Sequence, residues 1–173
     1  MRKNLGRVWA FIDGANLDQA IRRLDWHFDY ARFRVWLRER HGVERAYLFL
    51  GYLLQFERVY AARRADGYEM EFREVTFDPL TGKAKGNCDA DLVLKVAVDC
   101  CERRFDRAVI VSSDGDYAGL VDFLKERGAL ECVVSPSAAE RCSYLLRKLS
   151  VPMVYLPKFR DAVESPTKRK SPP

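Results

Sequence analysis

Near its beginning the chain reads Val8-Trp9-Ala10-Phe11-Ile12-Asp13-Gly14-Ala15-Asn16. The run from Val8 to Ile12 is short and almost continuously apolar, which is typical of a strand that is buried on both faces. It stops at Asp13, and Asn16 is expected to cap the following helix, with Gln19 as its capping-box partner. A buried strand that leads through a polar turn into a helix predicts an α/β fold.

Apolar runs alternate with amphipathic segments along the rest of the chain. The patterns predict further strands at residues 43–52, 68–73, 108–112, 130–134 and 151–156, and helices at residues 30–40, 55–64, 89–101, 117–127 and 137–149. Residues 68–73 alternate strictly, as in a half-exposed edge strand, and residues 78–86 read as a polar loop. Such alternation indicates a mostly parallel sheet with helices on both faces.

Helix ends carry recognisable signals. Asp29 is the expected N-cap of the helix at 30–40, and Gly42 is expected to end it. Ser137 and Glu140 have the spacing of a capping box for the helix at 137–149. From Pro157 onward the chain is rich in proline, lysine and arginine. We therefore expect one domain over residues 1–156 and a flexible basic tail over residues 157–173.

The composition sets limits on the class of protein. The chain has 173 residues, of which 48% are hydrophobic and 32% charged, and a net charge of +5. It can therefore bury a core, and its mild basic bias is compatible with a polyanionic partner without being diagnostic of one. Its 5 cysteines are odd in number and lack a C-x-x-C pair, and there are only 2 histidines. This pattern argues against a disulfide framework and a structural zinc site.

The N-terminus does not read as a signal peptide, because the apolar run after the basic residues is short and stops at Asp13. The longest strongly apolar stretch, residues 46–56, is shorter than the roughly 20 residues that a membrane helix needs. We expect a soluble, cytoplasmic protein.

Aspartates follow two of the predicted buried strands. Asp13 ends the first, and Asp114 and Asp116 follow the strand at 108–112. If the two strands are neighbours, these carboxylates converge on one crevice, where their repulsion calls for a compensating charge. A hard divalent cation with oxygen ligands is the natural candidate. Taken singly, each residue is better explained as a helix cap or turn former, but the coincidence of acids at two strand ends favours a functional cluster.

A fourth carboxylate is expected from the helix at 89–101, where Asp89 and Asp91 are both candidates. Asp91 is spaced with Lys95 and Asp99 as in a solvated salt-bridge stripe. Asp89 lies instead above the apolar face that should meet the sheet, so we assign Asp89 to the site and Asp91 to the surface. Ser112, Ser113 and Asn16 lie beside the acids in the sequence. They are expected either to position a water or phosphate oxygen or to cap the backbone.

Three motifs, taken together, resemble those of NYN domains, and specifically of the bacterial LabA-like group: residues 11–17 (FIDGANL), 85–89 (KGNCD) and 111–117 (VSSDGDY). The resemblance covers about residues 7–156. It implies a PIN-like, three-layer α/β/α fold with a mostly parallel central sheet of five or six strands. It also implies phosphodiester cleavage, usually of RNA, that depends on Mg²⁺ or Mn²⁺. The family's catalytic and metal-binding acids would fall on Asp13, Asp89, Asp114 and Asp116, and its polar first-motif residue on Asn16.

Substrate contacts are assigned to basic and aromatic residues. Lys83 and Lys85 are the best candidates for phosphate contacts, and Arg63 and Arg64 are weaker ones. Trp26, Phe28 and Tyr117 are aromatic side chains that could stack on bases, although Tyr117 also fits a core position. RNA is the expected partner, and a homo-oligomer is left open.

Other functions remain to be distinguished from an endoribonuclease. The same acidic pocket fits an RNA-binding or regulatory module with little or no catalysis. A phosphotransfer domain that forms an aspartyl phosphate is less favoured, because the first strand is followed by D-G-A-N and not by D-x-D. A nucleotide-binding oxidoreductase is disfavoured, because the sequence has neither G-x-G-x-x-G after the first strand nor a P-loop.

Overall fold

The central element of the protein is a parallel sheet of 6 strands in the order β3-β2-β1-β6-β7-β8. This computed structural model describes residues 6–82, 84–85 and 88–166, and for residues 84 and 85 only the backbone. The strands of the sheet are β1 (Val8–Asp13), β2 (Val43–Tyr52), β3 (Glu69–Glu74), β6 (Arg107–Val111), β7 (Leu130–Ser135) and β8 (Met153–Tyr155). The predicted parallel α/β sheet is confirmed.

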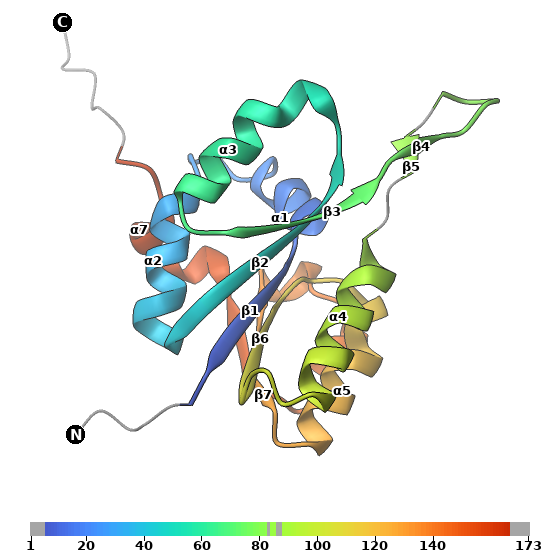
Figure 1. Ribbon diagram of the computed structural model, residues 1–173. Helices are drawn as coiled ribbons and strands as arrows, with labels where there is room; N and C mark the ends of the chain where they lie inside the picture. Colours follow the sequence, from blue (N-terminus) through green and yellow to red (C-terminus); the bar gives the residue numbers. More distant parts are fainter. Residues whose placement is uncertain (1–5, 83, 86–87, 167–173) are drawn as a thin grey trace, which may run out of the picture.

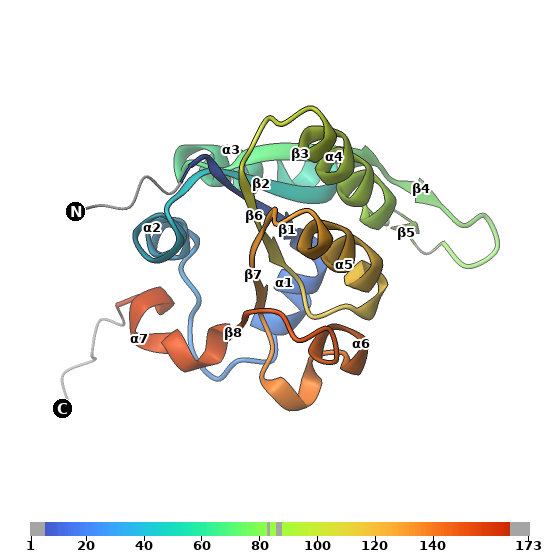
Figure 2. The ribbon, with the colours of Figure 1, turned by 90° about the horizontal axis from the view of Figure 1, so that it is seen from below.

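Helices cover both faces of the sheet (Figures 1 and 2). One face carries α1 (Gly14–Ile21), α2 (Tyr30–His41) and α7 (Arg160–Val163), and the other carries α4 (Asp89–Cys101) and α5 (Ala118–Glu126). α3 (Glu57–Ala65) lies against the edge strand β3, and the short α6 (Tyr144–Arg147) lies beside α5. The result is the expected three-layer arrangement.

Strand β1 separates the two layers of core. Val8, Ala10 and Ile12 pack toward α1 and α2, whereas Trp9 and Phe11 pack toward α4 and α5. Successive side chains of a strand point to opposite faces, so a continuous apolar run serves both cores at once. All five side chains are buried, as the apolar run predicted.

Several predicted boundaries match the structure. α2 begins after Asp29, whose carboxylate accepts a hydrogen bond from the Arg32 backbone N–H at 3.0 Å. It ends at Gly42, which has a φ of 69°. Only glycine adopts this left-handed conformation without a steric penalty, so it is well suited to end a helix. The bounds of β2 and α4 also agree with those predicted.

The predicted caps of two helices were wrong. Asp13, and not Asn16, is the N-cap of α1, because its carboxylate accepts from the Asn16 backbone N–H at 3.0 Å. The strand therefore passes into the helix with no intervening turn. The predicted helix at 137–149 is broken into η3 (Ala139–Arg141) and α6, and the cap of α6 is Ser143 instead of Ser137.

Three other segments differ in detail. The predicted helix at 55–64 begins with a 3₁₀ turn, η1 (Leu54–Phe56), before α3, and η2 (Gly115–Tyr117) likewise precedes α5. The predicted polar loop at residues 78–86 overlaps a small antiparallel hairpin, whose first strand, β4 (Thr76–Phe77), precedes the loop and whose second, β5 (Ala84–Lys85), lies within it. This hairpin projects away from the sheet (Figure 1).

Residues 157–166 do not form the expected flexible tail. The turn η4 (Leu156–Phe159) and α7 pack against α2, where the Phe159 ring lies 5.4 Å from that of Trp36. Val163 is fully buried, and its carbonyl accepts from the Asp29 backbone N–H at 2.8 Å. These apolar residues outweigh the polar composition of the segment. Residues 167–173 lie outside the described part of the chain.

The order of the strands determines where a ligand can bind. From β1 the chain moves outward through β2 to β3, whereas β6 is followed by β7 and β8 on the opposite side of β1. β1 and β6 are nevertheless neighbours, with Ile12 opposite Val111. This is a topological switch point, and ligands of such sheets bind beyond the carboxyl ends of the strands there.

Gly14 lets the start of α1 lie directly against the end of β2. A Cβ atom at this position would come within 2.5 Å of the Phe49 carbonyl oxygen and would also meet the Leu50 side chain. Because Phe49 contributes backbone, this contact cannot be relieved by a rotamer change. Gly14 thus sets the distance between α1 and the sheet.

We expect Gly14→Ala to lower the free energy of unfolding by about 1–3 kcal/mol, because α1 or β2 must shift to make room. Urea denaturation followed by circular dichroism measures this change. Gly119→Ala in α5 is the matched control, because a Cβ atom there meets nothing within 4 Å. The control should be neutral or stabilising by up to about 1 kcal/mol. Equal effects of the two substitutions would contradict the packing role of Gly14.

Candidate functional site

Three carboxylates meet at the switch point. One oxygen from each of Asp89, Asp114 and Asp116 lies within 4.8 Å of the others, and we call these 3 residues the acidic trio. Asp89 is the first residue of α4, Asp114 follows β6, and Asp116 lies in η2. The Asp114 carboxylate also accepts from the Asp116 backbone N–H at 3.0 Å, which orders the short turn that carries both acids.

Asp13 lies beside the trio but is not one of its members. It is buried, with 7% of its surface exposed. Its carboxylate accepts from the Asn16 backbone N–H at 3.0 Å and from the Ser112 hydroxyl at 3.2 Å. The Ser112 oxygen in turn accepts from the Asp114 backbone N–H at 3.1 Å. One hydroxyl therefore connects the Asp13 carboxylate to the backbone of Asp114.

Tyr117 connects Asp13 with the trio from a second direction. Its hydroxyl donates to the Asp89 carboxylate at 2.6 Å and also interacts with Asp13. Burial, followed by the charge of Asp13, raises the pKa of Tyr117, so the phenol stays protonated and acts as a donor. The ring is 1% exposed, so Tyr117 belongs to the core and cannot stack on a base.

The environment of Asp13 disfavours its charge. Burial raises the pKa of Asp13 above its ordinary value of 3.8, and the nearby charge of Asp89 raises it further. The Asn16 N–H and the Ser112 and Tyr117 hydroxyls partly oppose this rise in pKa. A cation near Asp13 would favour the ionised form of its carboxylate.

A network of hydrogen bonds joins the ends of β1, β6 and β7. The Ser113 backbone N–H donates to the Asn16 side-chain oxygen at 2.9 Å. The Ser113 and Ser135 hydroxyls lie 3.0 Å apart, and Ser135 donates to the Ser137 carbonyl at 2.7 Å. Because the Ser135 hydroxyl has one hydrogen and gives it to Ser137, the Ser113 hydroxyl must be the donor to Ser135. The predicted supporting residues Asn16, Ser112 and Ser113 thus hold the strand ends together.

Two contributors were missed at the sequence level. Ser135 is fully buried at the end of β7, and its position beyond an apolar run, like that of Ser112, was an available signal. Ser143 donates its backbone N–H to the Ser113 carbonyl at 3.0 Å. Its hydroxyl oxygen would lie only 2.4 Å from a Cβ atom on Gly115, so the start of α6 lies against the turn that bears Asp114 and Asp116. No local pattern indicated this contact.

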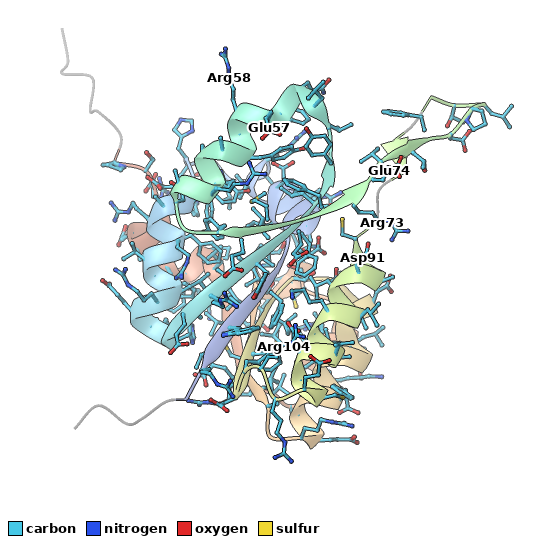
Figure 3. The ribbon with its side chains drawn as sticks, viewed as in Figure 1. Glu57, Arg58, Arg73, Glu74, Asp91 and Arg104 are labelled. Carbon is cyan, nitrogen blue, oxygen red and sulfur yellow. The ribbon has the colours of Figure 1, made fainter. Side chains whose placement is uncertain are left out.

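Asp91 points away from the trio. Its carboxylate pairs with Arg73 of β3 at 3.1 Å, and Figure 3 shows the two residues where the end of β3 approaches the start of α4. The structure therefore brings Asp89, and not Asp91, to the other acids. The predicted solvated stripe was wrong at Asp99, which is 1% exposed and pairs with Lys95 at 3.1 Å and with Arg104 at 3.2 Å.

The predicted substrate-binding residues are placed only in part. Lys83 and the side chain of Lys85 lie outside the described residues. Arg63 pairs with Asp66 at 2.8 Å, and Arg64 pairs with Glu57 at 3.2 Å. Of the remaining aromatic candidates, Trp26 is buried in the core, and Phe28 is half-buried with its ring 5.3 Å from that of Phe33 in α2.

Within the residues that the structure describes, no helix has the length and apolar character needed to cross a membrane.

Comparison with known proteins agrees with this architecture. The chain resembles a crystal structure of a protein of unknown function from Vibrio parahaemolyticus, with a TM-score of 0.72 and 18% sequence identity over 95% of this chain and 99% of that one. At this identity the likeness shows the fold alone. A search among curated proteins finds no match. The family model described as NYN domain matches residues 7–147, which include all four candidate acids. The chain therefore belongs to the NYN domain family.

Proposed function

We propose that this protein is a metal-dependent endoribonuclease that hydrolyses phosphodiester bonds of RNA with Mg²⁺ or Mn²⁺. Membership of the NYN family supports a nuclease, and assignment to the LabA-like group stays a prediction. The observation that carries the proposal is the acidic trio, whose 3 carboxylates lie within 4.8 Å of one another at the switch point of the sheet.

The donor set fits a hard divalent cation. Carboxylate oxygens are the ligands that Mg²⁺ and Mn²⁺ prefer, and three negative groups at this spacing repel one another without a counter-charge. Asp89, Asp114 and Asp116 would hold the ion. Asp13, which contacts Ser112 and Tyr117 beside the trio, would add its negative charge to the site without being one of these three ligands. A bound ion would polarise the phosphate and lower the pKa of a water molecule.

The surrounding residues keep the acids in place. Tyr117 orients Asp89, Ser112 ties Asp13 to the backbone of Asp114, and Asn16 holds the Ser113 backbone. Each of these partners is buried or half-buried, which limits how far the carboxylates can move. Such outer contacts commonly change metal affinity or activity 10–100-fold when they are removed.

The second candidate is an RNA-binding module that uses the same pocket without efficient catalysis. The half-buried Asp89 and the exposed Asp116 leave the trio open to solvent, as either function requires. The two candidates differ in turnover, so purified wild-type protein that binds RNA but never cleaves it with any divalent ion would favour the binding module.

We expect Asp114→Asn to lower the rate of Mn²⁺-dependent RNA cleavage about 100-fold or more while leaving RNA affinity largely intact, because a metal ligand is lost. Single-turnover cleavage of a labelled RNA measures the rate. Asp91→Asn is the matched control on α4, because Asp91 pairs with Arg73 and stays outside the trio. The cleavage rate of Asp91→Asn should remain within about twofold of the wild-type rate. A comparable loss in both variants would count against the trio.

Metal binding should appear without any substrate. Mn²⁺ at about 100 times its Kd should stabilise the wild-type protein by about 2.7 kcal/mol, and EDTA should reverse this gain. Thermal unfolding followed by circular dichroism measures the shift. Asp114→Asn should lose most of the gain and Asp91→Asn should keep it. A wild-type melting curve that does not respond to Mn²⁺ or Mg²⁺ would contradict the proposed metal centre.

The raised pKa of Asp13 predicts that the stability of the metal-free protein depends on pH. Because folding raises the pKa of Asp13, its contribution to the free energy of unfolding is fully present below the ordinary pKa of 3.8. This contribution is lost as pH rises through the raised pKa, where the buried carboxyl must ionise. In EDTA at neutral pH, Asp13→Asn should therefore be more stable than wild type, and this difference should shrink as pH falls toward 3.8. Urea denaturation across this range measures it. Saturating Mn²⁺ should reverse the order, and a pH-independent difference would contradict the assignment.

A further inference from the structure

The start of α6 lies against the turn that bears two acids of the trio. The Ser143 backbone N–H donates to the Ser113 carbonyl at 3.0 Å, and a Cβ atom on Gly115 would lie 3.1 Å from the Leu145 Cδ1 atom. Gly115 is part of that turn, so Tyr144 has on each side in the chain a neighbour that contacts it. Figure 2 shows α6 beside α5. The Tyr144 side chain is thus attached next to the candidate metal site.

Tyr144 presents an accessible aromatic ring at this place. It is 67% exposed, and the adjacent Leu145 is 44% exposed. The aromatic residues that the sequence suggested for base stacking are buried or half-buried, so Tyr144 supplies a surface that they do not. An accessible ring can stack on an unpaired base of any kind, because every base has a flat face.

Basic residues accompany Tyr144 in the sequence. Residues 141–149 include Arg141, Arg147 and Lys148 but no acidic residue. Arg147 and Lys148 follow Tyr144 by three and four positions, which places them on its side of the helix, and the Lys148 ammonium lies 5.9 Å from the centre of the Tyr144 ring. All three basic side chains are exposed, and within the described part of the chain none of them forms a salt bridge. We call Arg141, Tyr144, Leu145, Arg147 and Lys148 the α6 surface.

The α6 surface is chemically complementary to single-stranded RNA. Its cations attract phosphates, and its ring offers a stacking partner for a base. The carboxylates of the trio repel a phosphodiester, so cations beside the trio help to hold the strand there. In a duplex the bases stack on one another and leave none for the ring, which favours an unpaired strand. The excess of positive charge favours a polyanion over a neutral protein surface as the occupant.

We propose that the α6 surface binds the RNA strand beside the scissile phosphodiester, with one unpaired base stacked on Tyr144 and the adjacent phosphates held by the cations of this surface. This inference rests on the proposed function and adds to it the class of substrate, which is single-stranded RNA, and the surface that holds the strand. Because the face of a ring contacts no base edge, the site accepts any base.

The first test removes the ring. Tyr144→Ala lacks it, whereas Tyr144→Phe keeps it, and Leu94→Ala is the control for the loss of an exposed apolar side chain, because Leu94 of α4 is 64% exposed. Matching circular dichroism spectra and melting temperatures verify that the variants fold. The probes are a short fluorescein-labelled oligouridylate and an analogue of the same length that keeps the sugar–phosphate backbone but lacks every base. Fluorescence anisotropy in EDTA measures Kd, so cleavage does not interfere.

Removing the bases should weaken binding to wild type about fivefold or more. Tyr144→Ala should weaken binding of the oligouridylate about fivefold or more and keep its affinity for the abasic analogue within about twofold of wild type, so the effect of removing the bases shrinks. Tyr144→Phe and Leu94→Ala should bind both probes within about twofold of wild type. An oligoadenylate should show the same dependence on Tyr144, and a fully paired RNA duplex should show none.

The second test removes a cation. Arg147→Gln should make the slope of log affinity against log salt concentration shallower by about 0.7, because one phosphate contact is lost. Arg58→Gln is the matched control, because Arg58 is exposed on α3, and Figure 3 shows it pointing away from the body of the protein. This control should leave the slope unchanged. An equal change of slope in both variants overturns the phosphate contact at α6.

The inference is overturned if wild type binds no oligonucleotide, if Tyr144→Ala binds the oligouridylate as wild type does, or if this variant loses the same affinity for both probes or for the duplex. A change of oligomeric state in Tyr144→Ala, measured by light scattering, with unchanged RNA affinity would make the α6 surface a contact between copies of the chain and has the same consequence. Cleavage with Mn²⁺ is scored separately. Base-dependent binding through Tyr144 without cleavage overturns only the nuclease, whereas cleavage together with an affinity that does not depend on Tyr144 overturns only the assignment of the α6 surface.

Discussion

The parallel pairing of β1 with β6 is the constraint on which the rest of the structure depends. These strands are separated by almost a hundred residues of sequence, yet Ile12 lies opposite Val111, and both strands end in polar residues at the same edge. Their apolar runs fill the cores on both faces, so a slip of one residue in either strand would move every side chain into the opposite core, where its neighbours have different shapes. The register that buries the core therefore also fixes where Asp13 and Asp114 emerge.

Bringing acids to one edge carries an electrostatic cost, and the structure offsets part of it with neutral donors. The Tyr117 hydroxyl serves Asp89, the Ser112 hydroxyl serves Asp13, and backbone N–H groups serve Asp13 and Asp114. These donors hold the carboxylates in a fixed arrangement.

Gly14 determines how closely α1 lies against the sheet. The absence of a side chain at Gly14 lets α1 approach the Phe49 carbonyl and Leu50. The start of α1 is thereby held at the end of β1, where the Asp13 carboxylate caps the helix.

By itself, the sequence determined the layered fold and the identity of the acids at the strand ends. Strand burial follows from unbroken apolar runs such as residues 8–12, and Asp29 and Gly42 are local signals for the ends of α2. The spacing of residues on the helix at 89–101 also indicated that Asp89, and not Asp91, joins the other acids. Tertiary structure alone decided that Ser135 and Ser143 support the trio, that Tyr117 donates to Asp89 from the core, and that residues 157–166 pack on α2. These outcomes depend on which distant segments meet, because a side chain acquires its role from neighbours that local spacing does not specify.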